Sequence, residues 1–171
     1  MNLTNMNLTG TISPLFKSLT GLYGLYLGGN KLNGSIPETV TSLRQLKILD
    51  VSNNNLSKNL PPFSTKTIVI SGLESLRLLD LRYNTNFPPW TFPTDLNSYS
   101  RLAILGLSAT NFMGSLLDTF DSFPVLILLY LSENNLTRVL SESFSKLSRL
   151  SRLDFSDQKD NNKLSDTIQV L

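Results

Sequence analysis

The chain has 171 residues, of which 40% are apolar and 16% are charged, and its formal net charge is +2. It contains no cysteine and no histidine, which excludes thiol nucleophiles, disulfides, imidazole bases and most transition-metal sites. The charges are scattered and do not form the positive stripe of a nucleic-acid groove. We therefore expect no cofactor, no metal and no nucleic-acid partner.

The two features that would direct a chain to a membrane are missing from this sequence. Its first six residues lack the basic and apolar regions of a signal peptide. The longest apolar run, residues 125–131, is far shorter than the roughly 18 residues that a membrane span needs. The sequence therefore predicts no signal peptide and no membrane insertion by this segment.

Two apolar residues separated by one position recur along the whole chain. The first member of each pair is Met1, Leu25, Leu49, Leu79, Leu105, Leu129 or Leu153, with spacings of 24, 24, 30, 26, 24 and 24 residues. Each pair predicts a short strand with inward leucines, parallel to the strand of the next turn about 4.8 Å away. Because one turn cannot bury its own leucines, we predict a right-handed α/β-class solenoid of about six to seven turns, with the strands on its concave face.

A polar residue follows each predicted strand at a fixed distance. It is asparagine in four turns, at Asn30, Asn54, Asn84 and Asn134. A buried asparagine amide can bond to backbone groups of neighbouring turns, so these residues predict a structural ladder. Thr110 and Gln158 can replace it in part, whereas Met6 cannot.

The segment after the asparagine is best preserved at Gly34, Ile36 and Pro37, and we expect 3-10 or irregular structure on this convex side. Three stretches, 62–72, 85–98 and 158–161, break the rhythm. The first contains 68–70 (Ile-Val-Ile), which form either a second convex strand or a loop. The second places Trp90 between prolines, and we interpret this residue as packing over an irregular turn rather than as an anchor for a partner.

The stretch 19–37 reads L-x-x-L-x-x-L-x-L-x-x-N-x-L-x-G-x-I-P, which resembles the leucine-rich repeat of plant extracellular proteins. Residues 84–171 further resemble the auxin-linked transmembrane kinase subfamily of plant leucine-rich-repeat receptor kinases. The resemblance rests on the Pro/Trp loop at 87–96, on 116–126 and on 163–171.

This resemblance implies a receptor role on the apoplastic face of the plasma membrane. It implies a protein or peptide ligand, with a co-receptor or a secreted auxin-binding protein as partner. The cysteine-bearing cap, the later repeats, the membrane span and the kinase domain of that subfamily are absent. We therefore expect 1–171 to be a single domain that is a fragment of a receptor-like kinase or receptor-like protein, without either cap.

The predicted binding surface consists of outward-facing residues of the concave strands and the turns after them. Tyrosine, arginine and aspartate on a rigid sheet suit a protein or peptide partner. The residues are Tyr26, Asp50, Asp80, Arg82, Tyr83, Tyr130, Glu133, Arg152 and Asp154. The alternative is a solvated face, with the partner bound elsewhere or only by an intact receptor.

Three other functions are alternatives to recognition by a receptor of this subfamily. Asp50 and Asp80 should lie about 5 Å apart, near the spacing of a retaining glycosidase pair, but an open face offers no pocket for catalysis. A defence-type receptor or an inhibitor of a cell-wall enzyme remains an alternative within recognition. An ice-binding solenoid needs a flat row of Thr or Asn, and the mixed concave columns argue against it.

Sequons for N-glycosylation begin at five asparagines. Those in the turns, Asn7, Asn33, Asn55 and Asn135, are candidates for modification if the chain is secreted, and the fifth is Asn2. Their number is close to chance expectation, so they permit secretion without demonstrating it.

Overall fold

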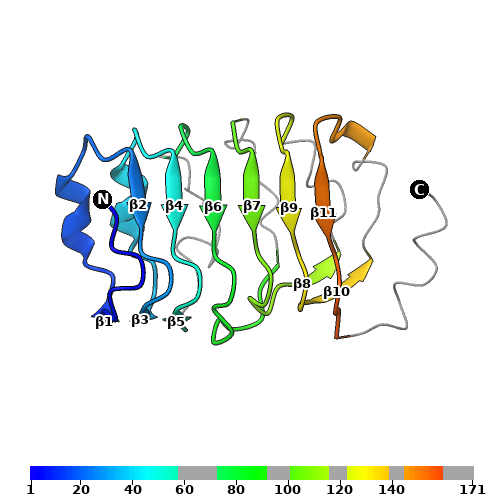
Figure 1. The fold of residues 1–171 in the computed structure, drawn as a ribbon, viewed down its shortest axis with the longest axis horizontal. Coiled ribbons are helices and arrows are strands. Elements are labelled where there is room, and N and C mark those ends of the chain that lie inside the picture. Colours follow the sequence, from blue (N-terminus) through cyan, green and yellow to red (C-terminus); the bar gives the residue numbers. More distant parts are fainter. Residues whose placement is uncertain (58–72, 92–100, 116–122, 139–144, 160–171) are drawn as a thin grey trace.

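The computed structural model describes residues 1–57, 73–91, 101–115, 123–138 and 145–159. These segments form an elongated stack of turns along one axis (Figure 1). The stretch 62–72, including 68–70, lies outside the described residues, as do residues 92–98 and 160–161 of the other two irregular stretches.

One parallel sheet runs the length of the stack and is built from the recurring apolar pairs. Its strands follow chain order: β2 (Gly24–Tyr26), β4 (Ile48–Asp50), β6 (Leu78–Asp80), β7 (Ile104–Gly106), β9 (Leu128–Tyr130) and β11 (Arg152–Asp154). Each pairs with the next without a shift, so that Leu49, Leu79 and Leu105 lie in one row. The first turn contributes a single bridge, Asn2 to Tyr26. The predicted parallel solenoid is confirmed.

The inward residues of these strands form one continuous core. Leu25, Leu49, Leu105 and Leu129 are almost completely buried, as are the second apolar residues of their pairs. Phenylalanines also contribute to the core, where Phe87, Phe112 and Phe123 are each at most 2% exposed. Burial of apolar surface shared between neighbouring turns is what stabilises a stack of this kind.

Two smaller parallel sheets lie beside the main sheet, along the lower edge of the stack in Figure 1. One comprises β1 (Thr9–Thr11), β3 (Lys31–Gly34) and β5 (Asn55–Leu56), and the other β8 (Met113–Ser115) and β10 (Asn135–Arg138). The sequence patterns did not predict these strands, because they lack the paired apolar residues of the main sheet; β1, β3 and β5 carry one buried leucine or none.

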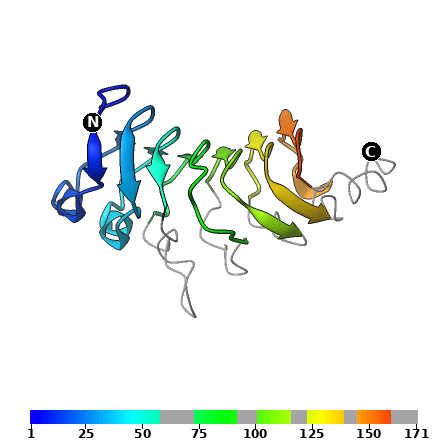
Figure 2. The same cartoon turned by 90° about the horizontal axis from the view of Figure 1, so that it is seen from below.

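The remaining helical structure is short. Two 3-10 helices, η1 (Pro14–Ser18) and η2 (Glu38–Ser42), pack against each other on the side away from the main sheet (Figure 2). Ser13 caps η1 by accepting a hydrogen bond from the backbone N–H of Leu15, and Pro14 fits the first helical position. Among the described residues, none of the helices has the length and apolar character to cross a membrane.

Candidate functional site

The asparagines after the strands fix the shape of the concave face. Asn84 is fully buried; its Nδ2 donates to the carbonyls of Val51 and Leu81, and its Oδ1 accepts from the N–H of Leu56. Asn30, Asn54 and Asn134 make the same kind of contact between their own turn and the preceding one. Each amide thus satisfies buried backbone groups that would otherwise be unpaired.

Two other residue types occupy the same position. Gln158 donates to the carbonyl of Leu131 and accepts from the N–H of Leu136, so its longer amide makes the contacts of an asparagine. At Thr110 the hydroxyl donates to the carbonyl of Leu107 in the same turn. Its backbone N–H is bonded by Asn134 of the next turn. The framework of the concave face therefore continues through both replacements.

The residue just before each ladder position has a left-handed backbone. The set comprises Asn5, Gly29, Asn53, Tyr83, Ala109, Glu133 and Asp157, with φ between 50° and 67°. Glycine and asparagine adopt this conformation readily, whereas tyrosine, glutamate and alanine do so at a cost. Tyr83 and Glu133, both predicted binding residues, therefore project from the turns after β6 and β9 and not from the strands.

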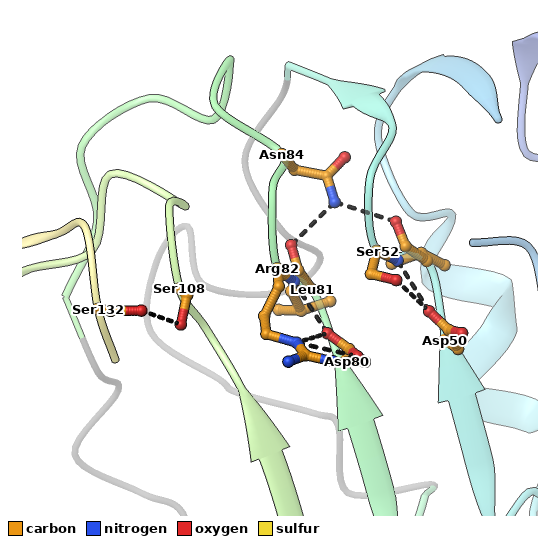
Figure 3. A network of polar contacts seen from close by, with 9 residues as sticks. Asp50, Ser52, Asp80, Leu81, Arg82, Asn84, Ser108 and Ser132 are labelled. Atoms are coloured by element: carbon orange, nitrogen blue, oxygen red, sulfur yellow. Dashed lines mark hydrogen bonds and ion pairs between the residues drawn. The ribbon is translucent and has the colours of Figure 1, made fainter. Parts of the chain in front are cut away.

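Three aspartates at the ends of β4, β6 and β11 are held by the residue two positions later. Asp50 Oδ1 accepts from the N–H and hydroxyl of Ser52, and Asp154 makes the same bonds with Ser156. Asp80 accepts from the N–H of Arg82 and forms a bidentate pair with its guanidinium, at 2.7 Å for the closest N–O contact (Figure 3). The carboxylates are thus oriented before any ligand arrives.

Asp50 and Asp80 are direct partners on neighbouring strands, yet their carboxylates bond to different residues, Ser52 and Arg82. A Cβ added at Gly28, in the preceding turn, would lie 3.0 Å from both Asp50 oxygens. A Cβ added at Gly106, on the following strand, would lie 2.7 Å from Asp80 Oδ1. The two acids therefore occupy spaces left by two different glycines, and their arrangement is not that of a glycosidase pair facing one bond.

Cationic and aromatic side chains form a cluster over the part of the sheet between β6 and β11. The guanidinium of Arg82 lies 4.7 Å from the ring centre of Tyr130, and that of Arg152 lies 5.4 Å from it. The hydrogen bond to Asp80 raises the pKa of Arg82 above its ordinary value, against an opposing effect of burial. Gly106 on the strand between Asp80 and Tyr130 leaves the room in which Arg82 lies.

Asp154 is the aspartate whose ionisation the site changes most clearly. Partial burial would raise its pKa, but hydrogen bonds from the backbone and hydroxyl of Ser156 and from the Ser132 side chain outweigh that effect. The charge of Arg152 acts in the same direction, and the pKa lies below its ordinary value of 3.8. The hydroxyls of Ser132 and Ser108 lie 2.9 Å apart and are hydrogen-bonded, which joins these two neighbouring turns (Figure 3).

One column of the concave face was not apparent from the sequence patterns. The residue before each first anchor leucine is Ile48, Leu78, Ile104 or Leu128 on four consecutive strands of the sheet, and these residues are paired in register. All four are half-buried, although they alternate with the core leucines and so point to the opposite side of the sheet. We call this row the aliphatic stripe. Arg152 continues the column on β11.

The structure brings most of the predicted binding residues together. Six of them lie on strands of one sheet, namely Tyr26, Asp50, Asp80, Tyr130, Arg152 and Asp154, and Arg82 lies two residues after the end of β6. Tyr26 lies close over Gly24, where an added Cβ would be 2.9 Å from its ring. That these residues bind a partner stays a prediction. Among the described residues, no three or more acidic side chains are grouped so that they could hold a metal ion.

Trp90 lies on the core side of its irregular turn. Its indole N–H donates to the carbonyl of Thr110 at 2.9 Å, and its ring packs 4.7 Å from that of Phe112. Asn111 closes the same turn by donating to the carbonyls of Thr85 and Phe87. These contacts support the interpretation of Trp90 as a packing residue.

Four of the five sequon asparagines lie away from the aliphatic stripe. Asn33, Asn55 and Asn135 belong to the small sheets, in β3, β5 and β10, and Asn7 precedes β1. Asn33 and Asn55 are direct partners on adjacent strands, and both are exposed. Asn2 differs, since it bridges to Tyr26 at the edge of the main sheet.

Comparison with known sequences relates the chain to plant receptors. The leucine-rich-repeat model matches residues 21–43, 45–66 and 125–147. Receptor-like protein 39 of Arabidopsis thaliana is 35% identical over 75% of this chain and 14% of its own length. Receptor-like protein 35 of the same plant is 31% identical over 94% of this chain and 18% of its own length. The chain thus spans less than a fifth of these relatives.

Solved structures with the same fold include receptors and one protein of another function. The Arabidopsis receptor kinase HAESA, solved with the peptide hormone IDA and the co-receptor SERK1, is 25% identical with a TM-score of 0.67, over 91% of this chain and 30% of its own. A plant ice-binding protein is 29% identical with a TM-score of 0.71, over 88% of this chain and 54% of its own. The chain is a leucine-rich-repeat solenoid, similar to Arabidopsis receptor-like proteins and to the ectodomains of receptor kinases.

Proposed function

We propose that this chain is a non-catalytic recognition module, part of the ectodomain of a plant receptor-like protein or receptor kinase, and that it binds a protein or peptide on its concave face. The observation that carries the proposal is the cluster of Arg82, Tyr130 and Arg152 on a rigid parallel sheet. Arginine and tyrosine are enriched among residues that dominate binding energy. The likeness to receptor-like proteins supports the same function.

Preorganisation is the second support. The Asp80 carboxylate and the Arg82 guanidinium hold each other in position. The ladder asparagines in turn hold the turn that follows β6. A ligand that binds such a surface loses little free energy to ordering of the receptor side chains. A small free-energy cost of ordering the receptor suits recognition of a flexible peptide, which itself becomes ordered on binding.

The experiment starts from the immobilised chain and a phage-displayed library of random peptides. The affinity of an enriched peptide is then measured by calorimetry for the wild type and for the Arg82→Ala, Tyr130→Ala double variant. We expect the double variant to bind at least about tenfold more weakly, since loss of one dominant contact costs more than 1 kcal/mol.

The control is the double variant Lys17→Ala, Lys31→Ala, which removes exposed cations from η1 and β3. It should bind the peptide as the wild type does. An equal loss of peptide affinity in both variants would indicate a general effect of charge. A loss of affinity in the control variant alone would place recognition on the convex side.

We further propose that the chain acts on the extracellular, apoplastic side of the plasma membrane and that Asn33 and Asn55 carry glycans there. Both are exposed and lie on the small sheet, where a glycan leaves the aliphatic stripe uncovered. Mass spectrometry of the chain secreted from plant cells tests this assignment. Unmodified asparagines at both positions in the secreted chain would contradict it.

The finer proposal is membership of the auxin-linked kinase subfamily, with a co-receptor or a secreted auxin-binding protein as the partner. It rests on the Pro/Trp loop, of which Phe87 and Trp90 pack into the structure. Direct titration with a purified secreted auxin-binding protein, with and without auxin, tests it. The absence of a heat change in both conditions would rule out this partner, but it would not affect the proposal of a recognition module.

Ice binding is the alternative that the likeness to a plant ice-binding protein raises. An ice-binding face needs a flat, regular row of threonine or asparagine. The concave columns mix aspartate, tyrosine, glycine and aliphatic residues, which argues against it. Thermal hysteresis of a millimolar solution of the chain would reverse this judgement, and we expect none beyond the colligative effect.

A further inference from the structure

Four cations lie along one edge of the main sheet, in the turns that lead into its strands. Lys47 and Arg77 directly precede β4 and β6, while Arg44 and Arg101 lie a few residues before β4 and β7. This edge runs along the top of the stack in Figure 1, opposite the small sheets. We call these four residues the basic rim.

Backbone hydrogen bonds between successive turns fix the spacing of the basic rim. The N–H of Arg77 donates to the carbonyl of Lys47 at 2.8 Å, and the N–H of Lys47 donates to that of Tyr23 at 2.8 Å. Ala103, two residues after Arg101, donates in the same way to Arg77 at 2.9 Å. The cations therefore come from three successive turns, which follow one another at about 4.8 Å on parallel-sheet spacing.

The charges of the basic rim are not paired with acids of the described part of the chain. The one ion pair there joins Asp80 to Arg82, so no described carboxylate lies within salt-bridge distance of a rim cation. Lys47 is half-buried and lies over the ring of Tyr23 at 4.5 Å, and the other three rim residues are exposed. The rim is thus accessible to an anion from solution.

The described acids near the basic rim do not cancel its charge. Glu74 lies in the turn before β6, and Asp50 ends β4. Asp80 is offset by Arg82, and Glu38 begins η2 on the side away from the main sheet. Four rim cations against Glu74 and Asp50 leave an excess of two positive charges at this edge.

The other exposed acids of the turns lie at the opposite edge of the sheet. Glu133 and Asp157 follow β9 and β11, and Glu133 comes six residues after Ile127, which occupies the column of Lys47 and Arg77. Six residues of extended chain span roughly 15–20 Å. Because the screening length is about 8 Å at physiological ionic strength, these acids have little effect on an anion at the rim.

The layout of the basic rim favours a linear anionic polymer. Its cations follow the axis of the stack at the spacing of the turns, which suits a ligand with a negative charge at every repeat. A polymer of uronic acids has one carboxylate on each sugar ring. An extended peptide instead places side chains on one face only about every 6.6 Å, which is longer than the spacing of the turns.

We propose that the basic rim binds an acidic polysaccharide, a polymer of uronic acids that runs along the stack with its carboxylates beside Lys47, Arg77 and Arg101. Complementary charge favours such a ligand and suppresses a neutral or basic one. The rim is a second binding surface, separate from the concave cluster of the proposed function. The choice of a polysaccharide as the polyanion rests on the proposed apoplastic placement of the chain.

The test measures binding of fluorescently labelled polygalacturonate oligomers to the whole chain by fluorescence anisotropy. The rim variant is Lys47→Gln, Arg77→Gln. The matched control variant is Lys31→Gln, Lys159→Gln, which removes the same charge from exposed positions after the strands. Fully methyl-esterified oligomers, polyglutamate and vesicles of anionic phospholipid are the comparison ligands.

We expect polygalacturonate to bind the wild type and the control variant to a similar extent. The rim variant should bind it at least about fivefold more weakly, because each exposed ionic contact contributes up to about 1 kcal/mol. Added salt should weaken binding to the wild type, since it shortens the screening length. The comparison ligands should all bind the wild type more weakly. Circular dichroism and the melting temperature establish that each variant is folded.

Equal binding of polygalacturonate to the rim variant, or an equal loss in the control variant, would overturn the inference. Binding of the methyl-esterified oligomers, polyglutamate or vesicles as tight as that of polygalacturonate would show that the ligand class is wrong. The library peptide should keep its affinity for the rim variant. If polygalacturonate does not bind while that peptide still depends on Arg82 and Tyr130, the rim inference fails and the proposed function stands.

Discussion

At the scale of single residues, the costliest feature of the concave face is the left-handed backbone before each ladder position. The sequence uses asparagine or glycine there in three turns, and Tyr83, Ala109 and Glu133 in three others. An L-residue without a short polar side chain loses about 1 kcal/mol or more in this conformation. Retention of tyrosine and glutamate at such positions is consistent with a use for their side chains beyond folding.

Replacing Tyr83 by asparagine should therefore stabilise the protein. Tyr83 is 48% exposed, so little packing is lost, and the φ of 58° becomes more favourable. We expect a gain of about 0.5–1 kcal/mol in the free energy of unfolding, measured by urea denaturation. The comparison is Tyr23→Asn, also at an exposed tyrosine but without a positive φ, which should give no gain. A less stable Tyr83→Asn protein would show that the ring contributes packing.

The lowered pKa of Asp154 predicts a pH dependence of stability. Because the folded-state pKa lies below 3.8, the carboxylate contributes stability that is present above that value and lost as pH falls through the folded-state pKa. The Asp154→Asn variant should thus lose less stability than the wild type between about pH 5 and pH 2. The effect is small, since the group is largely exposed and screened. Thermal melts across this range measure it, and a steeper fall in the variant would contradict the assignment.

At the scale of elements, the asparagine ladder connects the strands to the turns after them. Its positions follow from sequence spacing alone, because a buried amide that bonds two turns must recur once per turn. The similar bonding of Gln158 could be anticipated from its amide, whereas the bond of the Thr110 hydroxyl within its own turn follows from its shorter side chain. Spacing thus gives the position, and side-chain length decides the contact.

Asn84→Ala should be strongly destabilising. It removes two donors and one acceptor from a fully buried site and leaves the carbonyls of Val51 and Leu81 and the N–H of Leu56 without this partner. We expect a loss of about 3 kcal/mol in the free energy of unfolding, from chemical denaturation. Asn33→Ala, at an exposed position of β3, should change it by less than about 0.5 kcal/mol. Equal effects at the two sites would mean that the ladder does not stabilise the stack.

The strands of the main sheet could be predicted from the sequence, but the small sheets and the aliphatic stripe could not. Strands such as β5 have two residues and too short a pattern to recognise. The stripe is concealed for a different reason. Ile48 and Leu49 are consecutive apolar residues, and a period of two assigns only one of them to the core. A run of consecutive apolar residues is therefore interpreted as core, and the residue of each pair that faces outward, such as Ile48, is overlooked.

At the scale of the whole molecule, the two sides of the solenoid differ in what they offer. The concave side has the aliphatic stripe, the Arg82–Tyr130–Arg152 cluster and fixed carboxylates on one rigid sheet. The other side has the small sheets, the 3-10 helices and most sequons. This division suits a module that binds a partner on one side while the other faces solvent or glycans.

Hydrogen–deuterium exchange of the chain, with and without a peptide selected from the phage library, tests this division most directly. Amides exchange more slowly where a ligand reduces local opening of the backbone. We expect added protection in β4, β6, β7 and β9 and in the turns that carry Tyr83 and Glu133, with none in β1, β3 and β5. Protection confined to β1, β3, β5 or the 3-10 helices would contradict recognition by the concave face.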